Sequence, residues 1–600
     1  MSPTSVGTAA PGWPTSGATL DADRLHVVSR NLDRTRVAEI DIDAMAVVRQ
    51  RTIGAGDGAW GLTTAPDGVY VGLFGARGSG NLYRLTGASS SAVAALAVDY
   101  LWDLAAGDDG SVVGVGGNPG LVFRYDPATR RATDLGILTT RQRPRTCAAV
   151  GSRVVVGGKD DDRAVLVDRV ATGGAVRSLL PVALRTDDTV YCSAVTGDGQ
   201  IAVGTAGRDL DRPAIAVIPP GRPDDALVAR LPREALVDTV ACDGQAVYAT
   251  ARPSGAIYRL DGATGQLTRL AVPVPMSETR LLEVVDGDLI GVSADGSAWR
   301  HDVASGETRV VTVDDLGLVR RPQRGQSICA GADRVDVGGS FSMTRHRPAA
   351  GTATTRFVPG EPKAMVDVDG TTWFAVYPIG EVWAWPADAD APHRVTQLDS
   401  DQLRPVAMAH LAQLDALVCT TTDDLRRSLL NTIDPVTGRV DAVVNPLGGE
   451  VLAGVTTAGT TIYVGGSGSR PSVAAFDAVS GARLWTVADV IPQGGFLLGL
   501  QVIGPRLLVS SSRGWVATID LASRAVAAPV RVAQAGGQLR RTGSRALLAT
   551  GDRLLRIDPV DRSATTVESG LDGQFWNWPP MDVDPAGRAW LLRGRDLVHT

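Results

Sequence analysis

The stretch YLWDLAAGDDGSVVGVGGNPGLVFRYDPATRRATDLG, residues 100–136, decides the fold of this chain. It contains four short runs, 102–106, 111–115, 121–125 and 132–136, which are rich in the Val, Leu, Tyr and Phe that favour strands. The turns between the runs, GDDG, GGNPG and DPATR, are too short for anything but hairpins. The stretch therefore predicts a four-stranded antiparallel meander, which is about the size of one propeller blade.

The same unit recurs along the whole chain, and an aspartate after its third strand marks the regular copies. Its side chain accepts hydrogen bonds from backbone N–H groups two residues on, and the Thr or Ser and Gly that follow supply the turn. Neighbouring markers lie about 42 residues apart, and less regular units fill the wider gaps. The markers are Asp41, Asp126, Asp168, Asp261, Asp302, Asp434, Asp477, Asp520 and Asp558.

Counting the units gives fourteen, too many for one ring because propellers usually have about four to eight blades. We predict an all-β chain of two seven-bladed propellers, residues 1–320 and 321–600, with the seam in 314–326. In an alternative arrangement the middle units form one ring and the two chain ends together close the other. The last unit stops after its third strand, and the N-terminal segment is a candidate for its missing edge strand.

Composition excludes several classes of protein. Apolar residues make up 44% and charged residues 21%, as in soluble globular chains, and no apolar run is long enough to span a membrane. A net charge of −6 argues against a nucleic-acid partner. The N-terminus lacks the basic start and apolar core of a signal peptide, so secretion or display on the cell surface would require that a signal had already been removed.

The five cysteines show no C-x-x-C spacing, which argues against a zinc ribbon or a disulfide scaffold. Four of them fall in the first strand of different units, where small residues fit a crowded axis. We interpret them as packing residues. The six histidines show no short metal spacing, and we expect neither a metal nor another cofactor.

The segment VAAFDAVSGARLWTV, residues 473–487, resembles the repeat of PQQ-like quinoprotein propellers. Ser480 stands in place of the usual Thr, and Trp485 matches the docking tryptophan. In its strand rhythm the whole chain resembles the PQQ-like and YVTN/WD40-like propeller superfamily. The vicinal cysteine pair of quinoprotein dehydrogenases is absent, so PQQ binding is not carried over. Such propellers host enzymes, binding modules and scaffolds alike.

Departures from the repeat lie in the loops that enter the first strands. In the first ring they bring aromatic rings and arginines, which we predict bind an anionic carbohydrate because rings stack on sugars and Arg forks grip carboxylates. The alternative is that the rings only wedge between blades. The binding candidates are Trp60, Tyr100, Trp102, Arg143 and Arg145, with Phe74, Arg77, Arg141, Lys159, Arg185, Arg208, Arg212 and Arg280 nearby in the same loops.

Two irregular units in the second ring carry groups suited to a polysaccharide lyase. A base, an acid and a cation are needed to abstract a sugar proton, protonate the leaving oxygen and neutralise a uronate. The catalytic candidates are Arg345, His346, Lys363 and Tyr377, with Trp373 as a binding residue. Packing or solvent exposure would explain His346 and Tyr377 equally well.

A further aromatic group, Trp576 and Trp578, enters the last unit, either as a cap on the ring closure or as a sugar platform. The favoured hypothesis is a secreted propeller protein that binds, and in one version cleaves, an anionic polysaccharide. A non-catalytic scaffold for protein–protein or cell-surface interaction and a tandem-propeller glycoside hydrolase are the alternatives.

Overall fold

A computed structural model describes the chain and confirms that it is all-β. It describes residues 3–54, 56–75, 81–136, 142–151, 153–160, 163–170, 177–207, 213–398, 402–422, 428–445, 447–448 and 450–600. Within these ranges 59% of the chain is strand and 2% is helical. The helical part consists of four three-residue 3-10 turns: η1 (Val182–Leu184), η2 (Pro223–Asp225), η3 (Pro348–Ala350) and η4 (Ala412–Leu414).

The stretch that decides the fold forms one four-stranded antiparallel sheet. Its strands pair in chain order and are β11 (Tyr100–Ala106), β12 (Val112–Gly117), β13 (Leu121–Asp126) and β14 (Arg131–Gly136). Strand β12 is buried along its whole length, whereas β14 alternates between exposed and half-buried residues. The inner strands thus carry the apolar core and the last strand faces water, as in a propeller blade.

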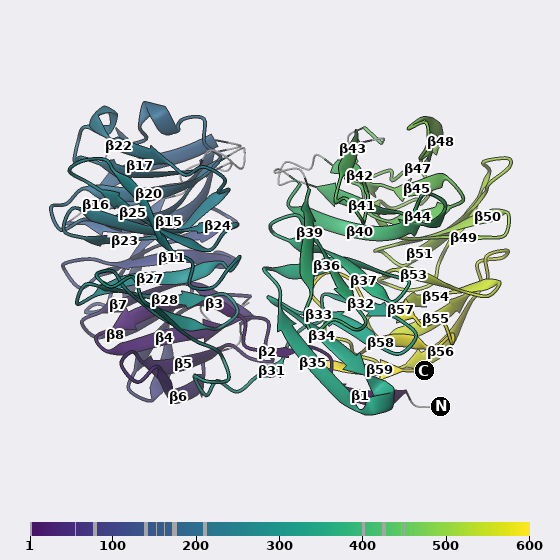
Figure 1. The fold of residues 1–600 in the computed structure, drawn as a ribbon, viewed down its shortest axis with the longest axis horizontal. Helices are drawn as coiled ribbons and strands as arrows, with labels where there is room; N and C mark the ends of the chain where they lie inside the picture. Colours follow the sequence, from purple (N-terminus) through teal and green to yellow (C-terminus); the bar gives the residue numbers. More distant parts are fainter. Residues whose placement is uncertain are drawn as a thin grey trace. The chain divides into compact units, whose positions relative to one another are not determined.

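The described residues contain fourteen such groups of four strands, which we call blades. Two of them join into one eight-stranded sheet through the pair Ala206 and Leu236, and a fifth short strand is added to another. The repeat predicted from the aspartate markers is therefore present in the structure as propeller-like blades (Figure 1).

The aspartate markers close the turn between the third and fourth strands as predicted. In one such turn the carboxylate of Asp477 accepts hydrogen bonds from the backbone N–H groups of Val479 and Ser480. Gly481 then adopts a φ of 68°, which favours glycine. In the turn after Asp520 the same position is Arg524, with a φ of 67°, so the turn forms even where glycine is missing.

The chain divides into two compact units. We call Trp13–Arg321 the N-terminal unit, and Pro322–Thr600 together with Met1–Gly12 the C-terminal unit. The first strands of the seven blades in the N-terminal unit are β3 (Thr15–Asp21), β7 (Gly58–Ala65), β11, β15 (Gln142–Val150), β19 (Thr189–Val195), β23 (Leu236–Asp243) and β27 (Thr279–Val285). Those in the C-terminal unit are β32 (Ser327–Ala330), β36 (Glu361–Val368), β40 (Arg404–Leu411), β44 (Val455–Ala458), β49 (Gly495–Ile503), β53 (Leu539–Thr542) and β57 (Asp582–Val583).

Within each unit the first strands of successive blades lie side by side. In the N-terminal unit this neighbour relation runs from β3 to β27, and β27 lies beside β3 again. In the C-terminal unit it runs from β32 to β57, and β57 lies beside β32. The core lies between blades: Tyr70 of one blade packs in a single buried cluster with Leu104 and Phe123 of the next.

The N-terminal segment completes the last blade of the chain. Strand β1 (Thr4–Thr8) pairs with β59 (Asp596–His599), which pairs with β58 (Ala589–Arg593), so this sheet has the order β1-β59-β58-β57. The backbone N–H of Ala9 then donates to the carbonyl of Arg595. The prediction that this segment supplies the missing edge strand is confirmed.

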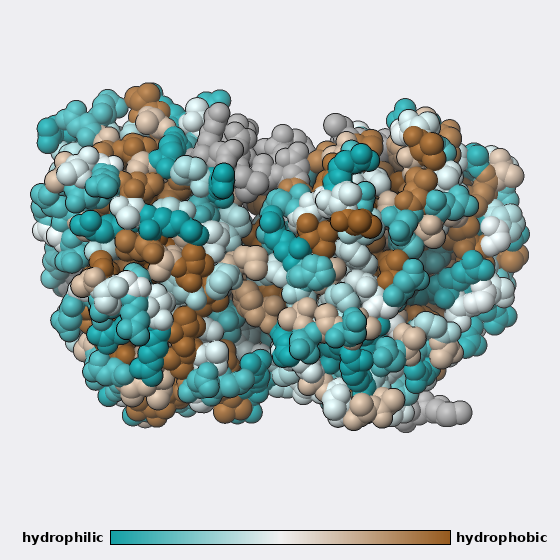
Figure 2. Space-filling model, viewed as in Figure 1, coloured by the Kyte–Doolittle hydropathy of each residue, from teal (hydrophilic) through white to brown (hydrophobic). Residues whose placement is uncertain are grey.

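The surface in view mixes apolar and polar side chains (Figure 2). Among the most exposed large apolar residues are Val436, Val479 and Val560, each two positions after a marker aspartate. Their exposure follows from the tight turn, whose second residue points outward.

Candidate ligand-binding rim of the N-terminal unit

A β-bulge recurs at the same place in the first strand of every blade of the N-terminal unit. In each of these strands the pairing with the second strand shifts by one residue near the start of the strand. A bulge leaves one residue unpaired and re-aims its side chain. The residues at these bulge positions are, in blade order, Ser16, Trp60, Trp102, Arg145, Tyr191, Asp238 and Arg280.

The second and third blades give this rim an aromatic half. Trp60 stacks on Phe74 at 3.9 Å between ring centroids and on Trp102 at 4.4 Å. Tyr100 lies 5.7 Å from Trp60 and 5.4 Å from Trp102. A Cβ atom on Gly117 would approach Trp102 Nε1 to 2.6 Å, so this glycine makes room for the indole. Phe74 is buried and the other three rings are half-buried, which leaves part of their surface open to a ligand.

The fourth and fifth blades continue the stack with a guanidinium group. Arg145 Cζ lies 4.2 Å from the ring centroid of Trp102 and 4.4 Å from that of Tyr191. Arg145 Nη2 also donates to the Tyr191 hydroxyl at 2.5 Å. Arg252, the last residue of β24 (Ala246–Arg252), also lies near Tyr191, with Cζ 5.9 Å from the ring centroid. Cations over aromatic faces are each worth about 0.5–2 kcal/mol, so the stack holds its members in fixed orientations.

An ion network completes the rim on the sixth and seventh blades. Arg252 Nε pairs with Asp238 Oδ1 at 2.5 Å, and Arg252 Nη1 lies 3.3 Å from Glu278 Oε2. Arg280 Nη1 lies 2.7 Å from Glu278 Oε1. All four side chains are less than a tenth exposed. Burial alone would raise the pKa of Glu278, but Arg252 and Arg280 outweigh it and the pKa is lowered.

Arginines and carboxylates lie side by side at this rim. Arg252 pairs with Asp238 and Glu278, and Arg280 pairs with Glu278, whereas Arg145 donates to the Tyr191 hydroxyl. Burial lowers the pKa of Arg280, Glu278 opposes this, and repulsion from neighbouring arginines lowers it further. The half-buried guanidinium of Arg145 is the cation of this rim that best suits an anionic ligand.

Asp103 links the blades that carry Trp102 and Arg145. Its Oδ2 accepts hydrogen bonds from Thr146 Oγ1 at 2.8 Å and from the Cys147 backbone N–H at 2.9 Å. Burial raises the pKa of Asp103 to about 6 against these bonds. The carboxylate ties the third blade to the fourth and thereby fixes the spacing between Trp102 and Arg145.

The remaining candidates of the first ring lie outside this stack or outside the described residues. Arg143 is exposed two residues before the bulge, and Arg185 is exposed after η1. Lys159 is buried and pairs with Asp188 at 2.7 Å. Arg77, Arg141, Arg208 and Arg212 lie outside the described residues.

In the C-terminal unit, Arg345 is part of the core. It lies in β34 (Ser342–Arg347), is 3% exposed, and makes two 2.9 Å hydrogen bonds to Asp336. It also donates to the carbonyls of Trp385 and Pro386 in the next blade. Its guanidinium thus joins two blades. The predicted catalytic role of Arg345 gains no support from this placement.

His346, the next residue, holds the N-terminal segment. It is 2% exposed, and its Nε2 donates to the carbonyl of Ala9 at 2.8 Å. Burial lowers the pKa of His346, so the ring is neutral near pH 7. Successive strand residues point to opposite faces, which separates His346 from Arg345.

Lys363 and Tyr377 do lie together. Lys363 occupies a bulge in β36, and its Nζ lies 5.8 Å from the ring centroid of Tyr377, the last residue of β37 (Thr371–Tyr377). The same Nζ pairs with Glu361 at 2.8 Å. The structure therefore brings together two of the four catalytic candidates.

The tryptophans predicted to bind substrate in this unit are dispersed. Trp373 lines a small hollow of about 220 Å³ that also contains His410 and Asp415. Trp576 lies under Arg324, whose Cζ is 5.7 Å from its ring, and Trp578 packs on Phe496 at 5.1 Å.

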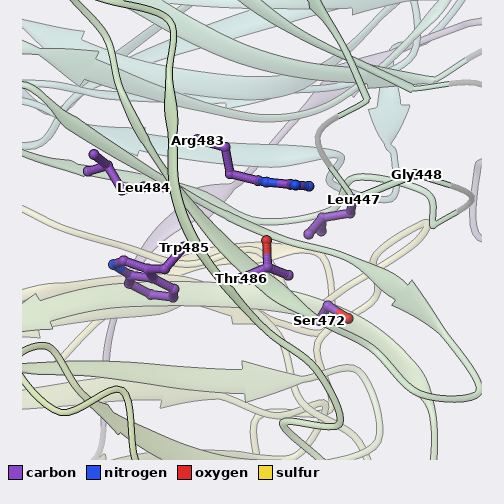
Figure 3. A pocket seen from close by; sticks show the side chains of 7 residues that line it. All are labelled: Leu447, Gly448, Ser472, Arg483, Leu484, Trp485 and Thr486. Atoms are coloured by element: carbon purple, nitrogen blue, oxygen red, sulfur yellow. The ribbon is translucent and has the colours of Figure 1, made fainter.

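A wider hollow of about 580 Å³ follows the outermost strand of another blade, β48 (Arg483–Val487), where Arg483 reaches toward Leu447 and Trp485 turns to the other side (Figure 3). Trp485 packs on Tyr463 and under Arg524.

The five cysteines are free thiols. Burial raises the pKa of every one of them, to about 12 for Cys242 and Cys419. The interpretation of these residues as packing residues agrees with this environment. Across the described ranges, no group of three or more His, Cys, Asp or Glu side chains is placed to hold a metal ion. None of the helical turns in the described part of the chain is long and apolar enough to cross a membrane.

No protein-family model matches this sequence, and no curated protein matches it. Among the solved structures that match is a crystal structure of the computationally designed Ika8 protein. It is 14% identical to this chain, and the match covers 52% of this chain and 92% of that one with a TM-score of 0.32. A TM-score this low supports no conclusion about fold or function.

Proposed function

We propose that each unit is a seven-bladed propeller and that the N-terminal unit binds an anionic oligosaccharide at its rim of bulge positions. The propeller proposal rests on the closed neighbour relation of seven first strands in each unit. The chain thereby resembles PQQ-like and YVTN/WD40-like propellers in architecture. As in the hypothesis from the sequence, the proposed ligand is a carbohydrate and no PQQ is involved.

The observation that carries the binding proposal is the stack Trp60–Trp102–Arg145–Tyr191, built from four successive bulge positions. Flat rings present apolar faces on which sugar rings stack. A guanidinium presents a fork that matches a carboxylate or a sulfate. A rim that offers both suits a chain of sugars that carries acidic groups.

Binding is the better supported half of the sequence hypothesis. Uronate lyase chemistry requires a base, an acid and a charge-neutralising cation around one sugar. Arg345 and His346 are buried and hydrogen-bonded to other protein groups. Of the four catalytic candidates, only Lys363 and Tyr377 lie next to each other. We therefore propose a binding protein without a lyase step. A polysaccharide ligand would place the protein outside the cell, either secreted or at the cell surface.

The test is isothermal titration calorimetry of the full chain with hexagalacturonate, and with maltohexaose as the neutral control. We expect binding of the acidic oligosaccharide alone. Trp102→Ala should weaken it by about 2 kcal/mol, or about 30-fold, because a central aromatic contact is lost. Arg145→Ala should weaken it similarly and reduce its salt dependence.

The matched control is Arg222→Ala, since Arg222 is 71% exposed in a surface ion pair with Asp225. Its affinity should equal that of the wild type. Equal affinity in Trp102→Ala would overturn the proposal. Release of unsaturated uronate or of new reducing ends during incubation would instead support the lyase or the glycoside hydrolase. Failure of every acidic glycan in a panel would favour the protein–protein scaffold.

A further inference from the structure

The C-terminal unit carries a strap across the side where its first strands begin. The backbone N–H of Trp576 donates to the carbonyl of Gly325, and the Gly325 N–H donates to the carbonyl of Gln574, both at 3.3 Å. Further along, Trp578 reaches Phe496 at the start of β49. The segment therefore contacts the first and the fifth blades before it enters the last one.

Closure of the ring explains only part of this strap. Phe575 packs against the cluster that contains Ile328, Trp590 and Leu592 and so helps to close the ring. Trp576 and Trp578 instead face Arg324 and Phe496 and remain half-buried. Part of each indole surface stays open at the rim.

The second and third blades bring cations to the same end of the unit. Lys363 occupies the bulge of β36, the position that corresponds to Trp60 and Arg145 in the N-terminal unit. Arg404, the exposed first residue of β40, lies with Cζ 4.7 Å from the ring centroid of Tyr377. Lys363 Nζ also approaches Gln326 Oε1 to 2.5 Å, which ties the second blade to the first.

The rim of the C-terminal unit thus repeats the chemistry of the other unit with different residues. Its cations are Arg324, Lys363 and Arg404, and the carboxylate of Glu361 pairs with Lys363. Each cation lies on or beside an aromatic ring, as Arg145 does. The two rims have unrelated local sequences but similar chemistry. A shared class of ligand is the simplest explanation of this similarity.

We propose that this rim is a second binding site for the same class of ligand, so that one chain holds two acidic oligosaccharide segments. The inference rests on the proposed function of the N-terminal unit and extends it from an oligosaccharide to a polymer. A protein with two sites gains avidity for a polymer that can occupy both, because the second binding event is intramolecular.

The experiment is calorimetric titration of the full chain with hexagalacturonate, read out as stoichiometry. The wild type should bind two molecules per chain. The double variant Trp578→Ala/Arg404→Ala should bind one, and the double variant Trp102→Ala/Arg145→Ala should also bind one. All four substitutions together should abolish binding. Arg439→Ala, which removes a 74% exposed arginine from the same unit, should still bind two.

The outcomes distinguish the second site from the proposed function of the N-terminal unit. One site in the wild type that disappears in Trp102→Ala/Arg145→Ala, and is unchanged in Trp578→Ala/Arg404→Ala, would overturn the second site and leave the proposed function standing. Absence of binding to any acidic glycan would refute both. If Trp578→Ala unfolds the unit, the single variant Arg404→Ala tests the second site instead. Because Arg404 is exposed, this substitution should weaken binding at the second site at least fivefold without lowering the melting temperature.

Discussion

Replacing Arg345 by methionine should destabilise the C-terminal unit, because the guanidinium is the main partner of a fully buried carboxylate. Asp336 is 0% exposed, and the substitution would remove both of its 2.9 Å bonds to Arg345. Breaking a buried ion pair from one side costs about 3–5 kcal/mol. Thr372 Oγ1 still donates to Asp336 at 2.6 Å, and Arg334 lies 3.7 Å from the same carboxylate. We therefore expect a loss of unfolding free energy at the lower end of this range, about 3 kcal/mol.

Scanning calorimetry measures the effect. For a unit of this size, about 3 kcal/mol corresponds to a fall in melting temperature of roughly 5 °C. The transition of the N-terminal unit should not move. The control Arg439→Ala removes only an exposed pair with Asp441 and should change the unfolding free energy by less than about 0.5 kcal/mol. A loss below about 1 kcal/mol in Arg345→Met would refute the structural role and return Arg345 to the catalytic candidates.

Four further results are expected. Burial lowers the pKa of His26 from 6.5 to about 4. The stabilising contribution of the neutral ring is therefore full above pH 6.5 and is lost as the pH falls toward 4. Chemical denaturation should show a loss of about 3 kcal/mol in unfolding free energy over this range, and His26→Gln should remove that loss. Deletion of residues 3–8, which removes β1 from β59, should lower the melting temperature of the C-terminal unit alone, and an unchanged transition would contradict the closure. Gly481→Ala should cost about 1 kcal/mol by thermal melting, because its φ is 68° while a Cβ would meet no neighbour within 4 Å. Native protein should react with no thiol reagent at Cys147, Cys329 or Cys419, whereas the denatured chain should react at all five cysteines.

The repeat was predictable because every blade needs the same local chemistry. A tight turn after the third strand requires an acceptor for two N–H groups, and Asp477 or Asp520 supplies it in the same way at each site. Strand order then follows from the short hairpins. The closing role of the N-terminal segment was also predictable, since the last unit lacks one strand and an uncovered edge is unfavourable.

The candidate rim was only partly predictable. Trp60, Trp102 and Arg145 were found because their residue types stand out, whereas Tyr191 and Asp238 resemble ordinary strand residues. What joins all five is the bulge, a property of pairing between two strands that no single strand reveals. Aligning the first strands of the blades on one another would have placed these residues in one column.

Residue type also misleads where burial decides the role. Arg345 and His346 are adjacent, and both have the chemistry of a lyase site. Arg345 is held by Asp336 and two carbonyls, and His346 holds Ala9, so both side chains already bond to the protein. Lys363 differs: it stands at a bulge over the ring of Tyr377 and pairs with Glu361. The same bulge that directs Arg145 in one unit directs Lys363 in the other. Recurrence of that backbone feature, together with residue type, is therefore the reason we propose ligand contacts at the starts of the first strands.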